Sequence, residues 1–142
     1  MKKMLLVLGL LIVGVAAFAG KYEDELVGRM KVAEEKAEAG WETGVRSEMI
    51  NASLNLDEEW EKELNKVYEL ILKKLPAKEQ AEFKAEQDKW KKDRENQVQK
   101  AYDKYAEEEG ERMAGELAAG NKLEITKNRT LELAKKYDKL VK

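Results

Sequence analysis

Residues 77–109, AKEQAEFKAEQDKWKKDRENQVQKAYDKYAEEE, carry a half-apolar face along their whole length. Successive positions of this face are four, three, four, four, three and four residues apart, which is the period of an α-helix. Pro76 is the single proline of the chain, and it stands where one helix must stop and another can start. The pattern predicts one long helix. Its face consists of Phe83, Gln87, Trp90, Arg94, Val98, Ala101 and Tyr105.

Two further helices are predicted before Pro76. The first covers residues 22–39 and ends at Gly40, so that residues 41–44 form a turn. The second covers residues 47–75, with the possibility of a break near Asn55 left open. The apolar positions of the first helix are Tyr22, Leu26, Met30, Ala33 and Ala37, and those of the second are Trp60, Leu64, Val67, Ile71 and Leu75.

The C-terminal part contains three glycines within residues 110–121, which predict a connection with at most one helical turn. A last helix is expected over residues 122–140, burying Leu123, Thr126, Thr130, Leu133, Tyr137 and Leu140. Strand-like alternation is absent, and the glycines interrupt any continuous heptad. The sequence therefore predicts an all-α fold, an antiparallel bundle of about four helices, as a single domain over residues 20–142.

The first nineteen residues, MKKMLLVLGLLIVGVAAFA, have the pattern of a signal peptide. Lys2 and Lys3 precede an apolar run that is shorter than the roughly 20 residues of a membrane span. An Ala-x-Ala cleavage site follows at residues 17–19. We expect residues 1–19 to be a leader that is cleaved off. The remaining domain should be exported without stable membrane insertion. Its expected location is the periplasm, with the medium as the alternative. An uncleaved anchor is the remaining possibility.

Composition excludes several classes of function. The chain has no cysteine and no histidine, so it offers no Cys–His or Ser-His-Asp constellation and none of the common zinc sites. Loss of Lys2 and Lys3 would change the net charge from −2 to about −4, which argues against nucleic acid as a partner. We expect a protein that is not an enzyme, binds no cofactor or metal, and has a protein partner; its oligomeric state is not predictable.

Gln87 and Arg94 are polar residues on the apolar face of the helix predicted for residues 77–109. Burial of an unpaired guanidinium or amide is costly, so each needs a partner. Residues next to Asp93, or Glu61 or Asp57 of the preceding helix, are candidate partners for Arg94. We favour a structural role that fixes the register between helices, with ligand contact as the alternative.

Four short motifs occur in a fixed order along the chain: Leu64-Asn65-x-x-Tyr68, Gln87-x-x-Trp90-x-x-x-Arg94, Gly110-x-x-Met113-Ala114 and Thr126-x-x-Arg129-Thr130-x-Glu132-Leu133. Their order and spacing over residues 47–133 resemble the LprI-like lysozyme inhibitor N-terminal domain family of exported helical bacterial domains. The resemblance implies that the structural motif residues are Leu64, Tyr68, Gln87, Trp90, Arg94 and Arg129. Similar domains usually carry cysteines, which this chain lacks, so packing must replace their disulfides.

The resemblance implies inhibition of lysozyme, a basic enzyme with two carboxylates in its cleft, by occlusion of that cleft. An acidic surface would steer the encounter, and the connection over residues 110–121 is the candidate element for entering the cleft. Arg112 would reach a cleft carboxylate, while neighbouring glutamates would face the basic rim. The candidate partner-binding residues are Glu109, Glu111, Arg112, Met113 and Glu116.

Three alternatives remain at this point. In the first, residues 110–121 are an ordinary glycine-rich linker packed on the end of the bundle. In the second, the protein is a periplasmic chaperone or stress protein that holds unfolded clients, which requires an exposed apolar groove. A cell-wall enzyme working through carboxylates alone is the third alternative, but glutamates at 58, 59 and 61 point in different directions on a helix, unlike a glycosidase pair.

Overall fold

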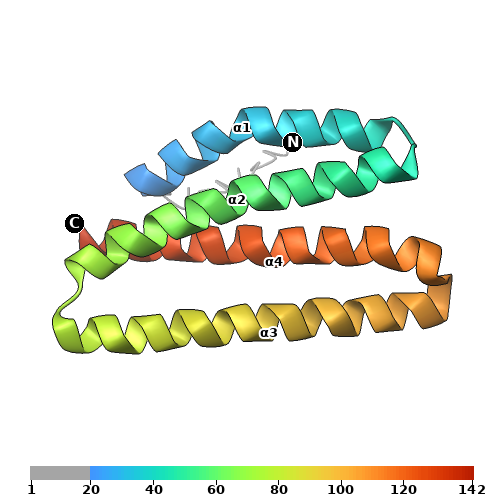
Figure 1. Cartoon of the computed structure of the whole chain (residues 1–142). Helices are drawn as coiled ribbons and strands as arrows, with labels where there is room; N and C mark the ends of the chain where they lie inside the picture. Colours follow the sequence, from blue (N-terminus) through green and yellow to red (C-terminus); the bar gives the residue numbers. More distant parts are fainter. Residues whose placement is uncertain (1–19) are drawn as a thin grey trace, which may run out of the picture.

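A computed structural model describes residues 20–142 of the chain, and the expected signal peptide over residues 1–19 lies outside these residues. The described part is all-helical. Four helices follow one another along the chain, α1 (Lys21–Glu42), α2 (Arg46–Lys74), α3 (Ala77–Glu109) and α4 (Glu111–Leu140). Each helix runs antiparallel to the one before it, as the sequence predicts, so α2 and α4 point in the same direction (Figure 1).

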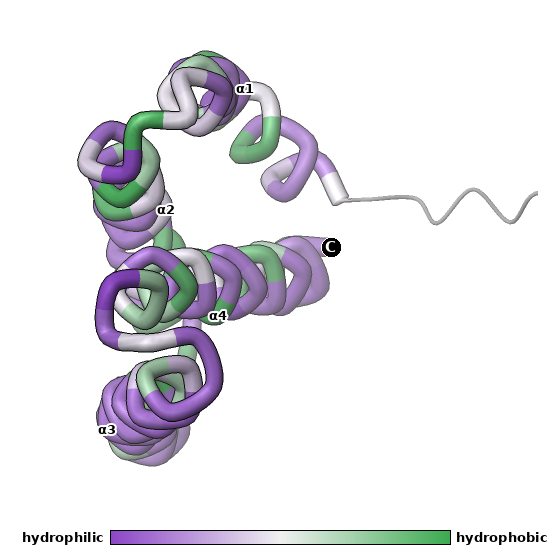
Figure 2. The backbone as a smooth tube through the Cα atoms, turned by 90° about the vertical axis from the view of Figure 1, so that its right-hand side faces the viewer, coloured by the Kyte–Doolittle hydropathy of each residue, from purple (hydrophilic) through white to green (hydrophobic). Residues whose placement is uncertain are grey.

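The helices are stacked in the order α1, α2, α4, α3, with α4 in contact with all three others (Figure 2). The contact between α2 and α4 is the most extensive one. Two clusters of buried apolar side chains hold the stack together. One joins α1, α2 and α4 through Leu26, Met30, Ala37, Ala52, Leu56, Trp60, Leu123 and Ala134, and the other joins α2, α3 and α4 through Leu64, Val67, Ile71, Phe83 and Leu133.

Pro76 separates α2 from α3 as the sequence predicts. Leu75 is extended at φ −85° and ψ 143°, the conformation expected of a residue before proline. The prediction that Gly40 ends α1 is wrong, because α1 continues to Glu42. A Cβ atom on Gly40 would lie 2.7 Å from Cβ of Ala52, so this glycine permits close packing of α1 on α2. The structure also has no break at Asn55.

The prediction that residues 110–121 form a connection is wrong as well. Only Gly110 leaves the helical conformation, at φ 85°, and α4 begins at the next residue. Gly115 and Gly120 lie inside α4, where each costs about 1 kcal/mol relative to alanine. Burial of the small side chains next to these glycines outweighs this cost. These side chains are Ala114, Ala118 and Ala119.

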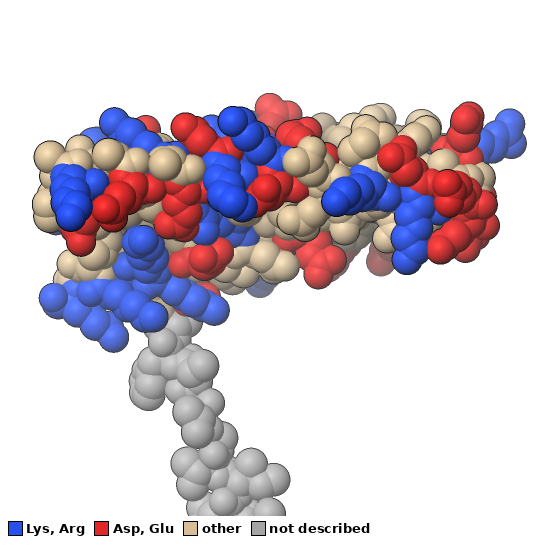
Figure 3. Space-filling view, turned by 90° about the horizontal axis from the view of Figure 1, so that it is seen from below, with Lys and Arg blue, Asp and Glu red and all other residues tan. Residues whose placement is uncertain are grey.

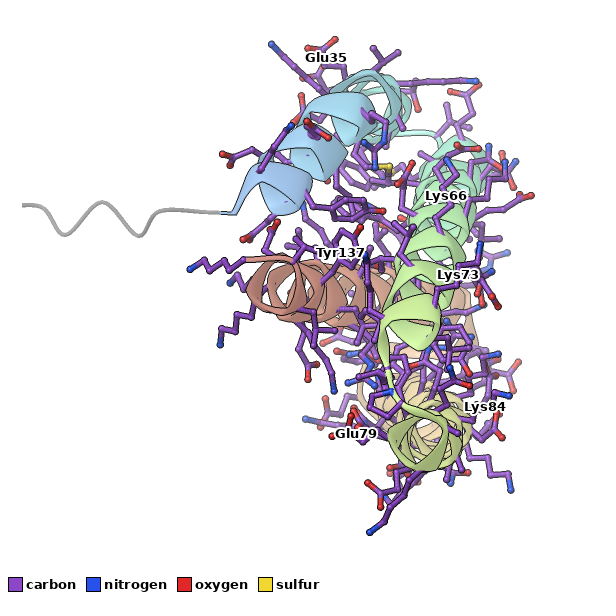
Figure 4. The ribbon with its side chains drawn as sticks, turned by 90° about the vertical axis from the view of Figure 1, so that its left-hand side faces the viewer. Glu35, Lys66, Lys73, Glu79, Lys84 and Tyr137 are labelled. Carbon is purple, nitrogen blue, oxygen red and sulfur yellow. The ribbon has the colours of Figure 1, made fainter. Side chains whose placement is uncertain are left out.

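Most of the predicted core positions are buried, with one clear exception. Leu140 was expected on the inner face of the last helix, but it is 40% exposed. Asp138, two residues earlier, is buried instead, and its carboxylate accepts hydrogen bonds from backbone N–H groups at the start of α1. Tyr137 lies half-buried between α1, α2 and α4, with its ring 5.0 Å from that of Tyr22 (Figure 4).

Candidate functional site

The turn between α3 and α4 forms one end of the molecule, and we call residues 107–112 the tip. Met113 and Ala114 donate backbone hydrogen bonds to the carbonyl oxygen of Gly110, both at 3.1 Å, so α4 starts directly after the turn. Every residue of the tip is exposed. Seen from below, acidic side chains gather at this end, whereas charges of both signs alternate along α3 (Figure 3). The acidic residues of the tip are Glu107, Glu108, Glu109 and Glu111.

The α4 side of the tip is fixed to the start of α2. Arg46 places Nη2 3.4 Å from the sulfur of Met113, and its Nε lies 3.9 Å from a carboxylate oxygen of Glu116. Ala114, the residue after Met113, is fully buried. Of the five candidate partner-binding residues, Glu109, Glu111 and Arg112 are therefore freely exposed, while Met113 and Glu116 are half-buried and engaged with Arg46.

The motif residues lie at the interface of α2, α3 and α4. Arg94 is buried there and donates to Glu61 Oε1 and to Thr126 Oγ1, each at 3.2 Å. Glu61 is one of the partners that the sequence predicts for Arg94. The guanidinium carbon also lies 4.8 Å from the centre of the Trp90 ring, close enough for a cation–π interaction.

Arg129 of α4 approaches Trp90 as a second guanidinium, 5.9 Å from the ring centre. It donates twice to Gln87 Oε1, at 3.0 and 3.1 Å, and once each to Glu86 and Glu132, at 2.8 and 3.1 Å. Sequence reasoning expected a partner for Gln87 but did not identify Arg129. The signal was present, since Gln87 and Arg129 are both polar motif residues on helices that the sequence predicts to pack in one bundle.

The remaining motif residues are part of the apolar core. Leu64 is fully buried, and the ring of Tyr68 stacks on Phe83 at 5.1 Å between ring centres. The six motif residues thus lie together along one interface of α2, α3 and α4. Because Arg129 binds Gln87 across that interface and Arg94 binds Glu61 and Thr126, the arrangement supports a role in fixing helix positions.

A third polar cluster joins α1 to α2. The buried carboxylate of Glu63 accepts hydrogen bonds from Arg29, at 2.8 and 3.3 Å, and from Lys66, at 3.1 Å. Burial by itself raises the pKa of Glu63, but the hydrogen bonds from Arg29 and Lys66 and their positive charges outweigh burial and leave the pKa below its ordinary value. Lys66 lies on the outer face of α2 together with Lys73 (Figure 4).

We expect Glu63→Gln to lower the free energy of unfolding by about 1 kcal/mol at neutral pH. Since folding lowers the pKa of Glu63, its contribution is complete above the unfolded value near 4.5 and is lost as the pH falls through the folded value. The difference between the wild type and the variant should therefore shrink as the pH falls below about 4.5, which urea titrations from neutral to acidic pH measure.

Glu59→Gln is the matched control, because Glu59 lies on the same helix and pairs with Lys62 at 2.6 Å in an exposed position. It should change stability by less than about 0.5 kcal/mol at every pH. A pH-independent effect of Glu63→Gln would contradict the titration argument.

Within residues 20–142, no group of three His, Cys, Asp or Glu side chains has a geometry that holds a metal ion. None of the helices in this region is long and apolar enough to cross a membrane.

The sequence model of one protein family, described as lysozyme inhibitor LprI, matches residues 33–133. The chain belongs to this family. Searches of curated proteins and of solved structures found no match. The family assignment that the motifs predict is thus confirmed, and the matched segment begins earlier than the expected residue 47.

The LprI segment contains all of α2 and α3 and the tip, together with all six motif residues. It leaves out the first half of α1 and the end of α4. The hydrogen bonds between Asp138 and the start of α1 therefore lie outside the LprI segment.

Proposed function

We propose that this LprI family member is an exported, non-enzymatic protein-binding domain that inhibits lysozyme by covering its cleft with the tip. The exposed acidic turn at the end of the α3–α4 hairpin is the observation that supports this proposal. A basic enzyme surface attracts such a turn over a distance of about one Debye length, roughly 8 Å at physiological ionic strength.

The tip is shorter than the connection that the sequence predicts for residues 110–121, and this difference favours binding. Its backbone is held by two helices joined by one residue, and Arg46 supports α4 from the side. A preorganised element loses less conformational entropy on binding than a flexible loop of twelve residues. In this proposal Arg112 approaches a carboxylate of the lysozyme cleft, and the four tip glutamates face the basic rim.

Export is part of the same proposal. The signal-peptide pattern of residues 1–19 supports it, as does the lysozyme inhibitor family, since lysozyme acts on cell walls. The periplasm is the proposed location and the medium the alternative.

The deciding experiment titrates the purified protein into an animal-type lysozyme digesting bacterial cell walls, at low and at physiological salt. We expect stoichiometric inhibition that persists at physiological salt. Replacement of Glu107, Glu108, Glu109 and Glu111 by Gln should raise the concentration for half-inhibition about tenfold or more, equivalent to at least about 1.4 kcal/mol. Arg112→Ala should weaken inhibition without changing the unfolding curve.

A matched control removes the same charge elsewhere. Glu69, Glu79, Glu82 and Glu124 are exposed and form no ion pair within residues 20–142, so their replacement by Gln equals the tip variant in net charge. We expect a change of less than about threefold from this control. Equal loss in both variants would reject the tip in favour of net charge, and absence of inhibition by the wild type would reject the proposal.

A further inference from the structure

A groove of about 400 Å³ runs between α1 and α4, away from the tip. Val27, Gly28 and Met30 of α1 form one wall, Leu131 of α4 lies opposite, and Trp60 of α2 belongs to the lining. This volume is within the range of ligand-binding pockets. Lys127, which also lines the groove, follows Gly110 by 17 residues, so about 25 Å of helix α4 separates the groove from the tip.

Trp60 is the unusual residue of this lining. Its side chain is 1% exposed, and its Nε1–H has no hydrogen-bond partner within residues 20–142. Trp41 provides the contrast, since its Nε1–H donates to Ser53 Oγ at 2.9 Å. Buried indole N–H groups normally have a partner. The Nε1 atom of Trp60 is closed off from solvent, so a molecule in the groove would meet other atoms of Trp60.

The rim of the groove carries more acidic than basic groups. Lys127 pairs with Glu34 at 2.6 Å and lies 5.2 Å from the centre of the Trp60 ring. Lys31 lies 4.0 Å from Glu35. Glu38, the remaining charged residue of the rim, forms no ion pair among residues 20–142. The rim therefore favours a ligand with a positive charge beside its apolar part.

We propose that this groove binds an extended apolar peptide segment flanked by a basic residue. Two apolar side chains of the peptide fill the space between Val27 and Leu131 and cover Trp60. The basic side chain lies beside Glu38. This activity is separate from lysozyme inhibition, and most of the α1 wall precedes the LprI segment, which begins at residue 33.

The test follows the three indole Nε1–H signals of the ¹⁵N-labelled protein by NMR while acetyl-Leu-Val-Leu-Lys-amide is added. Loss of one signal in Trp60→Phe assigns Trp60. We expect the Trp60 signal to shift in a saturable manner, because Trp60 lines the groove, while those of Trp41 and Trp90 stay in place. A peptide with Glu instead of Lys should bind about tenfold more weakly.

Gly28→Leu is designed to fill the groove. A Cβ atom on Gly28 meets nothing within 4 Å, so the backbone admits a side chain there, and leucine should fill part of the groove and weaken peptide binding about tenfold or more. Gly115→Leu is the matched control, because Gly115 also lies inside a helix and a Cβ there meets nothing within 4 Å. Binding should be unchanged in this control.

Each other outcome overturns the proposal. Absence of a shift at Trp60, or equal binding by Gly28→Leu and the wild type, would exclude the groove as the binding site. Equal affinity for the Lys and Glu peptides would reject the basic partner. Since none of these measurements uses lysozyme, failure here leaves the function proposed for the tip unaffected.

Discussion

Replacement of Arg129 by Met should lower the free energy of unfolding by about 3 kcal/mol, while far-UV circular dichroism keeps its helical shape. The reason is the group that remains behind. Gln87 is 2% exposed, and its side-chain oxygen accepts both of its hydrogen bonds from Arg129. Without Arg129 this oxygen is buried and unpaired, and Trp90 loses one of its two guanidinium neighbours.

Arg94→Met is the informative comparison. Glu61, its carboxylate partner, is 35% exposed and regains water when Arg94 is removed. Thr126 keeps its hydrogen bond to the carbonyl oxygen of Lys122 at 3.0 Å. We therefore expect a smaller loss, about 1 kcal/mol. Urea titrations of both variants would rank the two arginines, and a reversed order would contradict the role assigned to Gln87.

A double-mutant cycle isolates the Gln87–Arg129 pair. Gln87→Leu together with Arg129→Met removes the donor and the acceptor at once and leaves an apolar contact. The double variant should be less destabilised than the sum of the single variants by about 1–2 kcal/mol. Strict additivity would show that the two residues act independently.

The parts of the fold that the sequence predicted depend on local signals. Pro76 must stop one helix and can start the next, and the apolar spacing of residues 77–109 has a single period, so the α2–α3 boundary and the whole of α3 were predictable. The α3–α4 connection was not, because a glycine penalty of about 1 kcal/mol per residue is easily reversed by tertiary packing. Burial of Ala114, Ala118 and Ala119 provides that packing.

The candidate sites divide in the same way. The exposed glutamates of the tip are visible as a charge pattern in the sequence, and their exposure follows from their position at a helix end. The groove beside Trp60 was not predicted, because its walls belong to α1 and α4 and the space between them depends on how the two helices diverge. From the sequence, Trp60 is predicted only as an apolar core residue, and the structure confirms that it belongs to the core.

Helix α1, which forms one wall of the groove, is attached to α4 at its first turn. Gly20, the residue before α1, provides no side-chain cap. Asp138 of α4 replaces it, accepting from the backbone N–H groups of Tyr22 at 2.9 Å and Glu23 at 3.1 Å. A carboxylate at a helix N-terminus satisfies unpaired donors and interacts favourably with the helix dipole. The contact joins residues 115 or more positions apart in the chain.

Asp138→Ala should therefore lower the free energy of unfolding by about 2 kcal/mol, and Asp138→Asn, which keeps one acceptor oxygen without the charge, by about 1 kcal/mol. The loss should be concentrated in α1. Hydrogen exchange of amides near Leu26 should accelerate more than that of amides near Leu64 in α2, because a helix without its cap opens locally before the whole domain unfolds.

Asp103→Ala is the control, since Asp103 is exposed on α3 and accepts, among residues 20–142, only from Gln99 one turn earlier, at 2.9 Å. It should change stability by less than about 0.5 kcal/mol and leave exchange in α1 unchanged. If Asp138→Ala accelerated exchange equally in α1 and α2, the cost would belong to the whole bundle, and the attachment of α1 would depend on Leu26 and Met30 rather than on the cap. If exchange rises in α1 alone, the wall of the groove is held by a single carboxylate of α4.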